Sequence, residues 1–135
     1  MPTLTRWFLK TSLIYLLLAL LAGILLALPV ETRLSGLFPV YIHTLAFGWL
    51  TQLIFGVALW MFPKYSNTQP RGHEWLGWAT YILLNAGLSL RVIFEPLHGL
   101  SPSTLSSWML VVAATLQWLA GLAFVSNTWT RVREK

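Results

Sequence analysis

The sequence predicts an all-α protein: an integral membrane four-helix bundle that forms a single domain over residues 1–135. Hydrophobic residues make up 56% of the chain, and the mean hydropathy is +0.67. Charged residues make up only 10%, whereas a soluble domain carries about a quarter. The apolar residues form four continuous runs rather than alternating with polar ones, which favours helices over the strands of a membrane barrel.

The first predicted span covers residues 12–28 and ends at Pro29. Arg6 and Lys10 precede it, as basic residues precede the core of a signal peptide. Signal-peptide cores are only about 7–15 residues long and end in small residues at a cleavage site. The run ends in Leu28-Pro29-Val30-Glu31, so we expect it to be retained as a span.

Proline sets the boundaries of the next two predicted spans, because it suits the first turn of a helix and disrupts the interior. The second span covers residues 38–62, with Pro39 near its start and Pro63 just beyond its end. The third covers residues 75–94 and is expected to stop at Glu95-Pro96, and the fourth covers residues 105–129. All four are close to the roughly 20 residues that a hydrocarbon core requires.

The basic residues predict the orientation. Seven fall on one side of the predicted spans and two on the other; the seven are Arg6, Lys10, Lys64, Arg71, Arg131, Arg133 and Lys135, and the two are Arg33 and Arg91. The positive-inside rule then places both termini in the cytoplasm, in a multi-pass protein of the cell (inner, cytoplasmic) membrane. Because these residues lie at span ends, the net charge of +5 does not indicate a nucleic-acid partner.

An ionisable side chain, His43, lies inside the second apolar run. A polar group at such a depth is costly without a partner, so it marks a candidate functional site. The predicted topology puts His43, Arg91 and His98 in the outer half of the membrane and His73 on the cytoplasmic side. Haem iron commonly takes imidazole ligands, and a helical bundle offers an apolar slot for the ring. We therefore expect His43 to be an axial ligand of a b-type haem.

Neighbouring residues extend this hypothesis. Phe47 and Leu50 would line the porphyrin, and Gly48 leaves room for the ring or for another helix. Arg91 and Arg33 are the candidate partners of the haem propionates, because guanidinium groups bind carboxylates in pairs of hydrogen bonds.

Each residue also has a simpler interpretation. His43 could anchor the helix or bond to another helix, and His98 could be exposed to solvent in a loop. Arg91 and Glu95 are four residues apart and could form a local ion pair.

A glutamine flanked at four-residue spacing by small residues occurs twice in the sequence. Gly48, Gln52 and Gly56 are four residues apart, and so are Ala113, Gln117 and Gly121. Such residues share one helix face and allow close packing of membrane helices, which is the simplest interpretation here.

Two segments resemble the catalytic subunit of the haem-copper oxidase and nitric oxide reductase superfamily. The first holds His43 near the outer end of a helix, the Gly48-Trp49 pair, Gly56, and Pro63 followed by Lys64. The second is the stretch of residues 83–91, Leu-Leu-Asn-Ala-Gly-Leu-Ser-Leu-Arg. The resemblance implies that His43 binds a low-spin haem toward the outer face.

The chain also departs from that family. The family's subunit has about twelve spans and a copper or iron held by several more histidines, whereas this chain has four predicted spans and three histidines. We therefore expect no copper and no oxygen reduction by one chain. The second haem ligand would come from His98, from another subunit, or be absent. A homotrimer would imitate the family's three four-helix arcs, and a dimer could share a haem between two His43 residues.

The sequence therefore predicts a b-type haem protein that transfers electrons, with a respiratory redox partner, or binds NO or O2. The alternatives are a cofactor-free accessory or assembly subunit of a respiratory complex and a small transporter. A transporter needs an acid deep in a span, and all four acids (Glu31, Glu74, Glu95 and Glu134) are expected at span ends or tails. Hydrolytic catalysis has no motif to support it, and oxidoreductase activity is expected only within an assembly.

Overall fold

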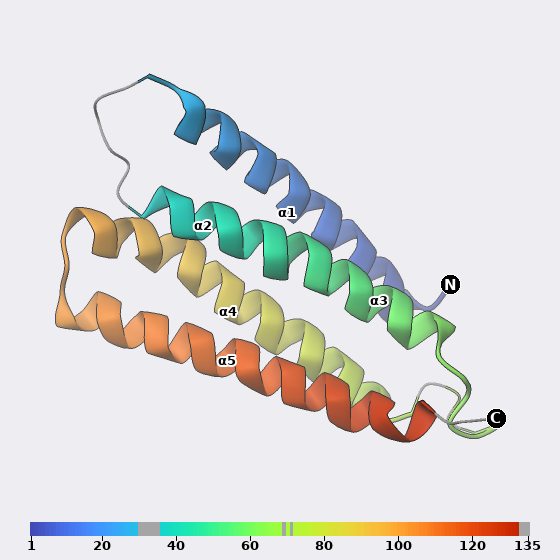
Figure 1. The fold of residues 1–135 in the computed structure, drawn as a ribbon. Helices are drawn as coiled ribbons and strands as arrows, with labels where there is room; N and C mark the ends of the chain where they lie inside the picture. The colour runs from blue at the N-terminus through green and yellow to red at the C-terminus, as the bar shows by residue number, and fades with distance from the viewer. Residues whose placement is uncertain (30–35, 69, 71, 133–135) are drawn as a thin grey trace.

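The computed structural model describes residues 1–29, 36–68, 70 and 72–132, which fold into four long helical segments (Figure 1). In order, these are α1 (Thr3–Ala27), the continuous segment α2 (Leu37–His43), η1 (Thr44–Thr51) and α3 (Gln52–Met61), then α4 (Glu74–Leu100), and finally α5 (Thr104–Thr128) with the 3-10 turn η2 (Trp129–Arg131). We call the second segment helix 2. All four are long and apolar enough to cross a membrane by length and composition, and the described residues are helical, which confirms the all-α prediction.

Two helices extend past the boundaries predicted for their spans. α1 begins at Thr3, nine residues before the expected start, so Arg6 and Lys10 lie within the helix. α4 does not stop at Glu95-Pro96 but continues through Pro96 to Leu100. Proline removes one backbone donor, and membrane bundles tolerate this loss where neighbouring groups compensate for it. As a result, Glu95 lies inside a helix rather than in a loop.

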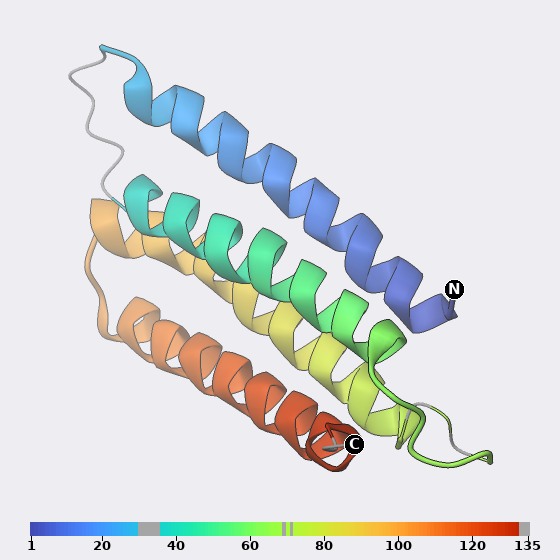
Figure 2. The same cartoon turned by 45° about the vertical axis from the view of Figure 1, so that its right-hand side comes forward.

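The segments pack in sequence. α1 lies against helix 2, helix 2 also contacts α4, and α4 forms a long hairpin with α5 (Figures 1 and 2). Helix 2 and α5 run in one direction, and α1 and α4 in the other. Residue 1 and η2, the last described element, lie at one end, which we call the termini end; we call the opposite end, where helix 2 begins and α4 turns into α5, the His43 end.

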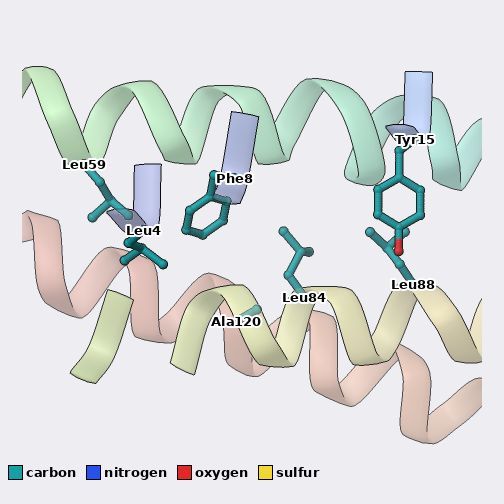
Figure 3. Packing of buried hydrophobic residues seen from close by; sticks show 7 residues of the cluster. All are labelled: Leu4, Phe8, Tyr15, Leu59, Leu84, Leu88 and Ala120. Carbon is teal, nitrogen blue, oxygen red and sulfur yellow. The ribbon is translucent and has the colours of Figure 1, made fainter. Parts of the chain in front are cut away.

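Apolar side chains from all four segments form the core (Figure 3). Its buried members are Leu4, Phe8 and Tyr15 from α1, Leu59 from α3, Leu84 and Leu88 from α4, and Ala120 from α5. Large apolar side chains also cover the outer surface; Leu17 is 68% exposed and Trp118 is 64% exposed. A soluble protein would rarely expose so much apolar surface, and lipid contact accounts for it.

Helix 2 meets α1 at three glycine contacts. A Cβ on Gly56 would lie 2.7 Å from the Cβ of Phe8, and one on Gly48 would lie 2.6 Å from the Cγ of Tyr15. One on Gly23 would lie 3.3 Å from the Cε2 of Tyr41. The two residue numbers of each pair total 63 or 64, as expected of antiparallel helices in a constant register.

A π-helical stretch, η1, makes this register possible. Val40, Thr44, Gly48, Gln52 and Gly56 are all buried, and each lies four residues from the next. In an α-helix, with about 3.6 residues per turn, each step of four residues overshoots a full turn, so from the first to the fifth position the side chains rotate around the helix axis by about 160°. A π-helix bonds each residue five positions back and holds about 4.4 residues per turn, so it drifts in the opposite sense. η1 therefore cancels most of this rotation and keeps the five buried positions facing α1.

Candidate functional site

Three polar contacts link three helices at the His43 end. His43 Nδ1 on α2 lies 2.8 Å from Glu95 Oε1 on α4. The same oxygen lies 2.9 Å from Arg91 Nη1, one turn earlier on α4. Arg91 Nε in turn donates to Gln117 Oε1 on α5 at 2.9 Å. We call these four residues the polar chain.

His43 is the outermost member of the polar chain. Its side chain is 24% exposed, and its ring stacks on Phe47 with the ring centres 6.1 Å apart. Nδ1 lies within ion-pair distance of Glu95 but is not aligned with it as a hydrogen bond. With Nδ1 facing the carboxylate, Nε2 is the nitrogen left to bind another group.

Glu95 is the central member, and its side chain is only 6% exposed. Its Oε1 contacts both His43 and Arg91, whereas its Oε2 is buried without a hydrogen-bond partner. Glu95 lies near the end of α4, as expected of the acids, but it is inside the helix and buried rather than in a loop. Its burial follows from the continuation of α4 through Pro96, which the sequence did not indicate.

Arg91 is hydrogen-bonded to side chains within the bundle. Its side chain is 17% exposed, and it forms the ion pair with Glu95 that the four-residue spacing indicated. Gln117, which the sequence suggested only as a packing residue, accepts its second hydrogen bond. Nε and one N–H of Nη1 are engaged, so a haem propionate would have to bind the remaining N–H groups on Nη1 and Nη2.

The structure separates the other candidates. Gly48 packs against Tyr15, so of its two interpretations the approach of another helix is the one observed. Phe47 stays beside His43 and is 38% exposed. His98 lies in the last turn of α4 rather than in a loop, and its Nδ1 is 2.8 Å from Ser106 Oγ on α5. Arg33 lies outside the described residues.

His43 and Glu95 are not joined by a third histidine or acid in the described part of the chain. Within the described ranges, no three His, Cys, Asp or Glu side chains are placed to hold a metal ion together. His73 precedes α4 at the termini end, far along the bundle from His43. At the polar chain, a metal ion could be held by one imidazole nitrogen, Nε2 of His43.

Comparisons with known proteins add no relative. No protein-family model, curated protein or solved structure matches the chain. The polar chain itself is therefore the basis for assigning a function.

Proposed function

We propose that this protein is a b-type haem protein of the cell (inner) membrane, with both termini in the cytoplasm, and that His43 Nε2 ligates the haem iron. One observation carries the proposal: the Glu95 carboxylate lies against His43 Nδ1. Metal-binding histidines usually present their second nitrogen to a carboxylate or carbonyl, which fixes the ring and makes the ligating nitrogen more basic.

The surroundings of His43 fit one face of a porphyrin. Phe47 stacks on the imidazole, and Phe47 and Leu50 expose apolar surface on the same helix, at 38% and 47%. Gly48 does not contribute space, because Tyr15 fills it. The ring would therefore lie on the outer side of helix 2, where one chain covers only one of its faces.

A second copy of the chain would cover the other face. A homodimer could supply a second His43 as the sixth ligand, and a homotrimer would surround the same surface. Haem would supply one-electron transfer or the binding of NO or O2, depending on whether its sixth position is filled. The residues of this chain would bind and orient the group, and a respiratory partner would supply electrons.

An absorption spectrum tests the proposal directly. The protein would be purified in mild detergent from cells supplied with haem precursors, and spectra would be recorded before and after reduction. We expect reduced-minus-oxidised bands of haem b in the wild type and their loss in His43→Ala. His73→Ala, at the opposite end, should keep them. A colourless wild-type preparation would overturn the proposal.

The burial of Glu95 supports a second candidate, a proton-coupled transporter. Ionisable acids inside membrane spans commonly serve proton relays, and Glu95 is a buried acid within a span-length helix. The two functions separate in liposomes that contain a pH-sensitive dye. Proton uptake driven by a solute gradient, in a colourless preparation, would favour the transporter over the haem protein and over a cofactor-free accessory subunit.

A further inference from the structure

Four buried polar side chains carry atoms without a hydrogen-bond partner. Among the residues that the structure describes, the buried side-chain atoms without a hydrogen-bond partner lie on His43, Glu95, Gln117 and Gln52. The first three belong to the polar chain. Gln52 is completely buried, and neither its Nε2 nor its Oε1 has a partner. Each such group costs about 1–3 kcal/mol, so these atoms need an explanation.

Helix register places Gln52 just deeper than Gln117. The rings of Phe55 on α3 and Phe124 on α5 stack with centres 3.8 Å apart, which sets a common level for these two parallel segments. Gln52 precedes Phe55 by three residues, about 5 Å, and Gln117 precedes Phe124 by seven, about 10 Å. The two amides therefore differ in depth by about one helical turn.

A third polar group lies at the level of Gln52. The register of α1 and helix 2, fixed by Phe8 against Gly56 and Tyr15 against Gly48, places Ser12 opposite Gln52. Ser12 is completely buried, and its hydroxyl donates to the Leu9 carbonyl oxygen at 2.8 Å. Its oxygen keeps lone pairs that can accept a further hydrogen bond.

The unpartnered atoms are a mixture of donors and acceptors. Glu95 Oε2 accepts, Gln117 Nε2 donates, and Gln52 can do both. A cation or an anion would satisfy only one kind. Water both donates and accepts, and buried waters typically make about three hydrogen bonds to groups of this type.

We propose that a file of internal water molecules runs from Glu95 past Gln117 to Gln52 and Ser12. The file enters at the His43 end, where His43 is partly exposed, and stops at the Phe55–Phe124 stack, whose rings are 5° from parallel. The bundle then contains a hydrated half-channel that is closed toward the termini end. This inference holds whether or not His43 binds haem.

The absence of cysteine from the sequence allows a sharp test with single substitutions. Gln52→Cys would be compared with Ile54→Cys, on the lipid-facing side and 52% exposed, and with Leu59→Cys, buried beyond the aromatic stack. Each purified variant would be exposed to Ag⁺, an ion close to water in size. Because Ag⁺ binds the thiolate, which forms only in contact with water, we expect the cysteine at 52 to react about tenfold faster or more. Equal, slow reaction at all three positions would overturn the proposal.

A measurement on the unmodified protein guards against a variant that does not fold. In lipid nanodiscs, magnetisation transfer from water to the side-chain amide protons of Gln52 and Gln117 would be recorded by NMR. Asn85, whose Nδ2 donates to the Tyr81 carbonyl, provides the comparison. We expect transfer to both glutamines and much less to Asn85. Its absence from both glutamines would contradict the water file.

Discussion

The carboxylate of Glu95 lies 2.8 Å from His43, although the two residues are on different helices and 52 positions apart in the sequence. The contact joins α2 to α4, and Arg91 extends it to α5 through Gln117. A buried carboxylate with two nitrogen partners ties three helices together at one end of the bundle. Its charge should therefore matter for stability independently of any ligand.

Glu95→Gln tests the charge with almost no change in shape. The substitution leaves the Arg91 guanidinium, 17% exposed, without its anion, and hydrogen bonds to charged groups contribute about 1.5–3 kcal/mol. We expect the unfolding free energy to fall by about that amount, measured by denaturant titration in micelles.

Glu74→Gln is the matched control, because Glu74 is an exposed acid in the first turn of the same helix. It should change stability by less than about 1 kcal/mol. Combining Glu95→Gln with Arg91→Met should cost less than the sum of the two single changes, because neither charge is then left alone. Additive losses would show that the two side chains are not coupled.

Three glycines with different surroundings give the second prediction. A Cβ at Gly48 or Gly56 would come within 2.7 Å of the Tyr15 or Phe8 side chain near its backbone, whereas one at Gly121 would meet no atom within 4 Å. Gly48→Ala and Gly56→Ala should each lower the unfolding free energy by about 1–3 kcal/mol, because α1 must move away. Gly121→Ala should be neutral or stabilising by up to about 1 kcal/mol, because alanine favours helix. Equal effects at the three positions would contradict the α1–helix 2 register.

The sequence identified the four apolar segments and the Arg91–Glu95 pair because both depend on local patterns. Continuous apolar runs indicate spans, and a four-residue spacing indicates a helix contact. It did not identify the pairing of His43 with Glu95, because Pro96 after Glu95 indicates a helix end. Whether a proline ends a membrane helix depends on the neighbouring helices, which local sequence does not reveal.

The sequence did not predict the π-helical stretch η1 either. Gly48, Gln52 and Gly56 indicated a shared face, and three positions fit an ordinary α-helix. Only the extension of the buried stripe to Val40 and Thr44, seen once α1 is in place, requires additional residues per turn.

Deletion of one residue from η1 gives the third prediction. Leu50 lies in η1 and is 47% exposed, so its removal takes no side chain from the core. The remaining residues can form a regular α-helix that keeps Gln52 and Gly56 near α1, and we expect a folded protein that loses less than about 2 kcal/mol.

Deletion of Leu17, which is exposed in the regular helix α1, rotates the rest of that helix by about 100° and should prevent folding. Circular dichroism and size-exclusion chromatography in detergent would distinguish the two outcomes, and equal disruption would contradict the role assigned to η1.

The last prediction concerns Arg131, which the sequence suggested only as a topology signal. Its side chain is 1% exposed, and it donates to three carbonyl oxygens at the end of helix 2, those of Leu59, Phe62 and Pro63, at 3.2, 2.9 and 3.0 Å. The last carbonyls of a helix have no partner within it, so the guanidinium caps helix 2 and fastens the C-terminal segment to it. Arg131→Met should lower the unfolding free energy by about 2–4 kcal/mol, because it leaves buried carbonyls without donors. Arg131→Lys should recover only part of the loss, because an ammonium group cannot reach several carbonyls in a planar fork. Arg6→Met is the control: Arg6 is exposed and, among the described residues, its side chain donates to the Met1 carbonyl alone, so the loss should stay at about 0.5 kcal/mol. A lysine variant as stable as the wild type would show that charge alone, and not the shape of the cap, holds this end together.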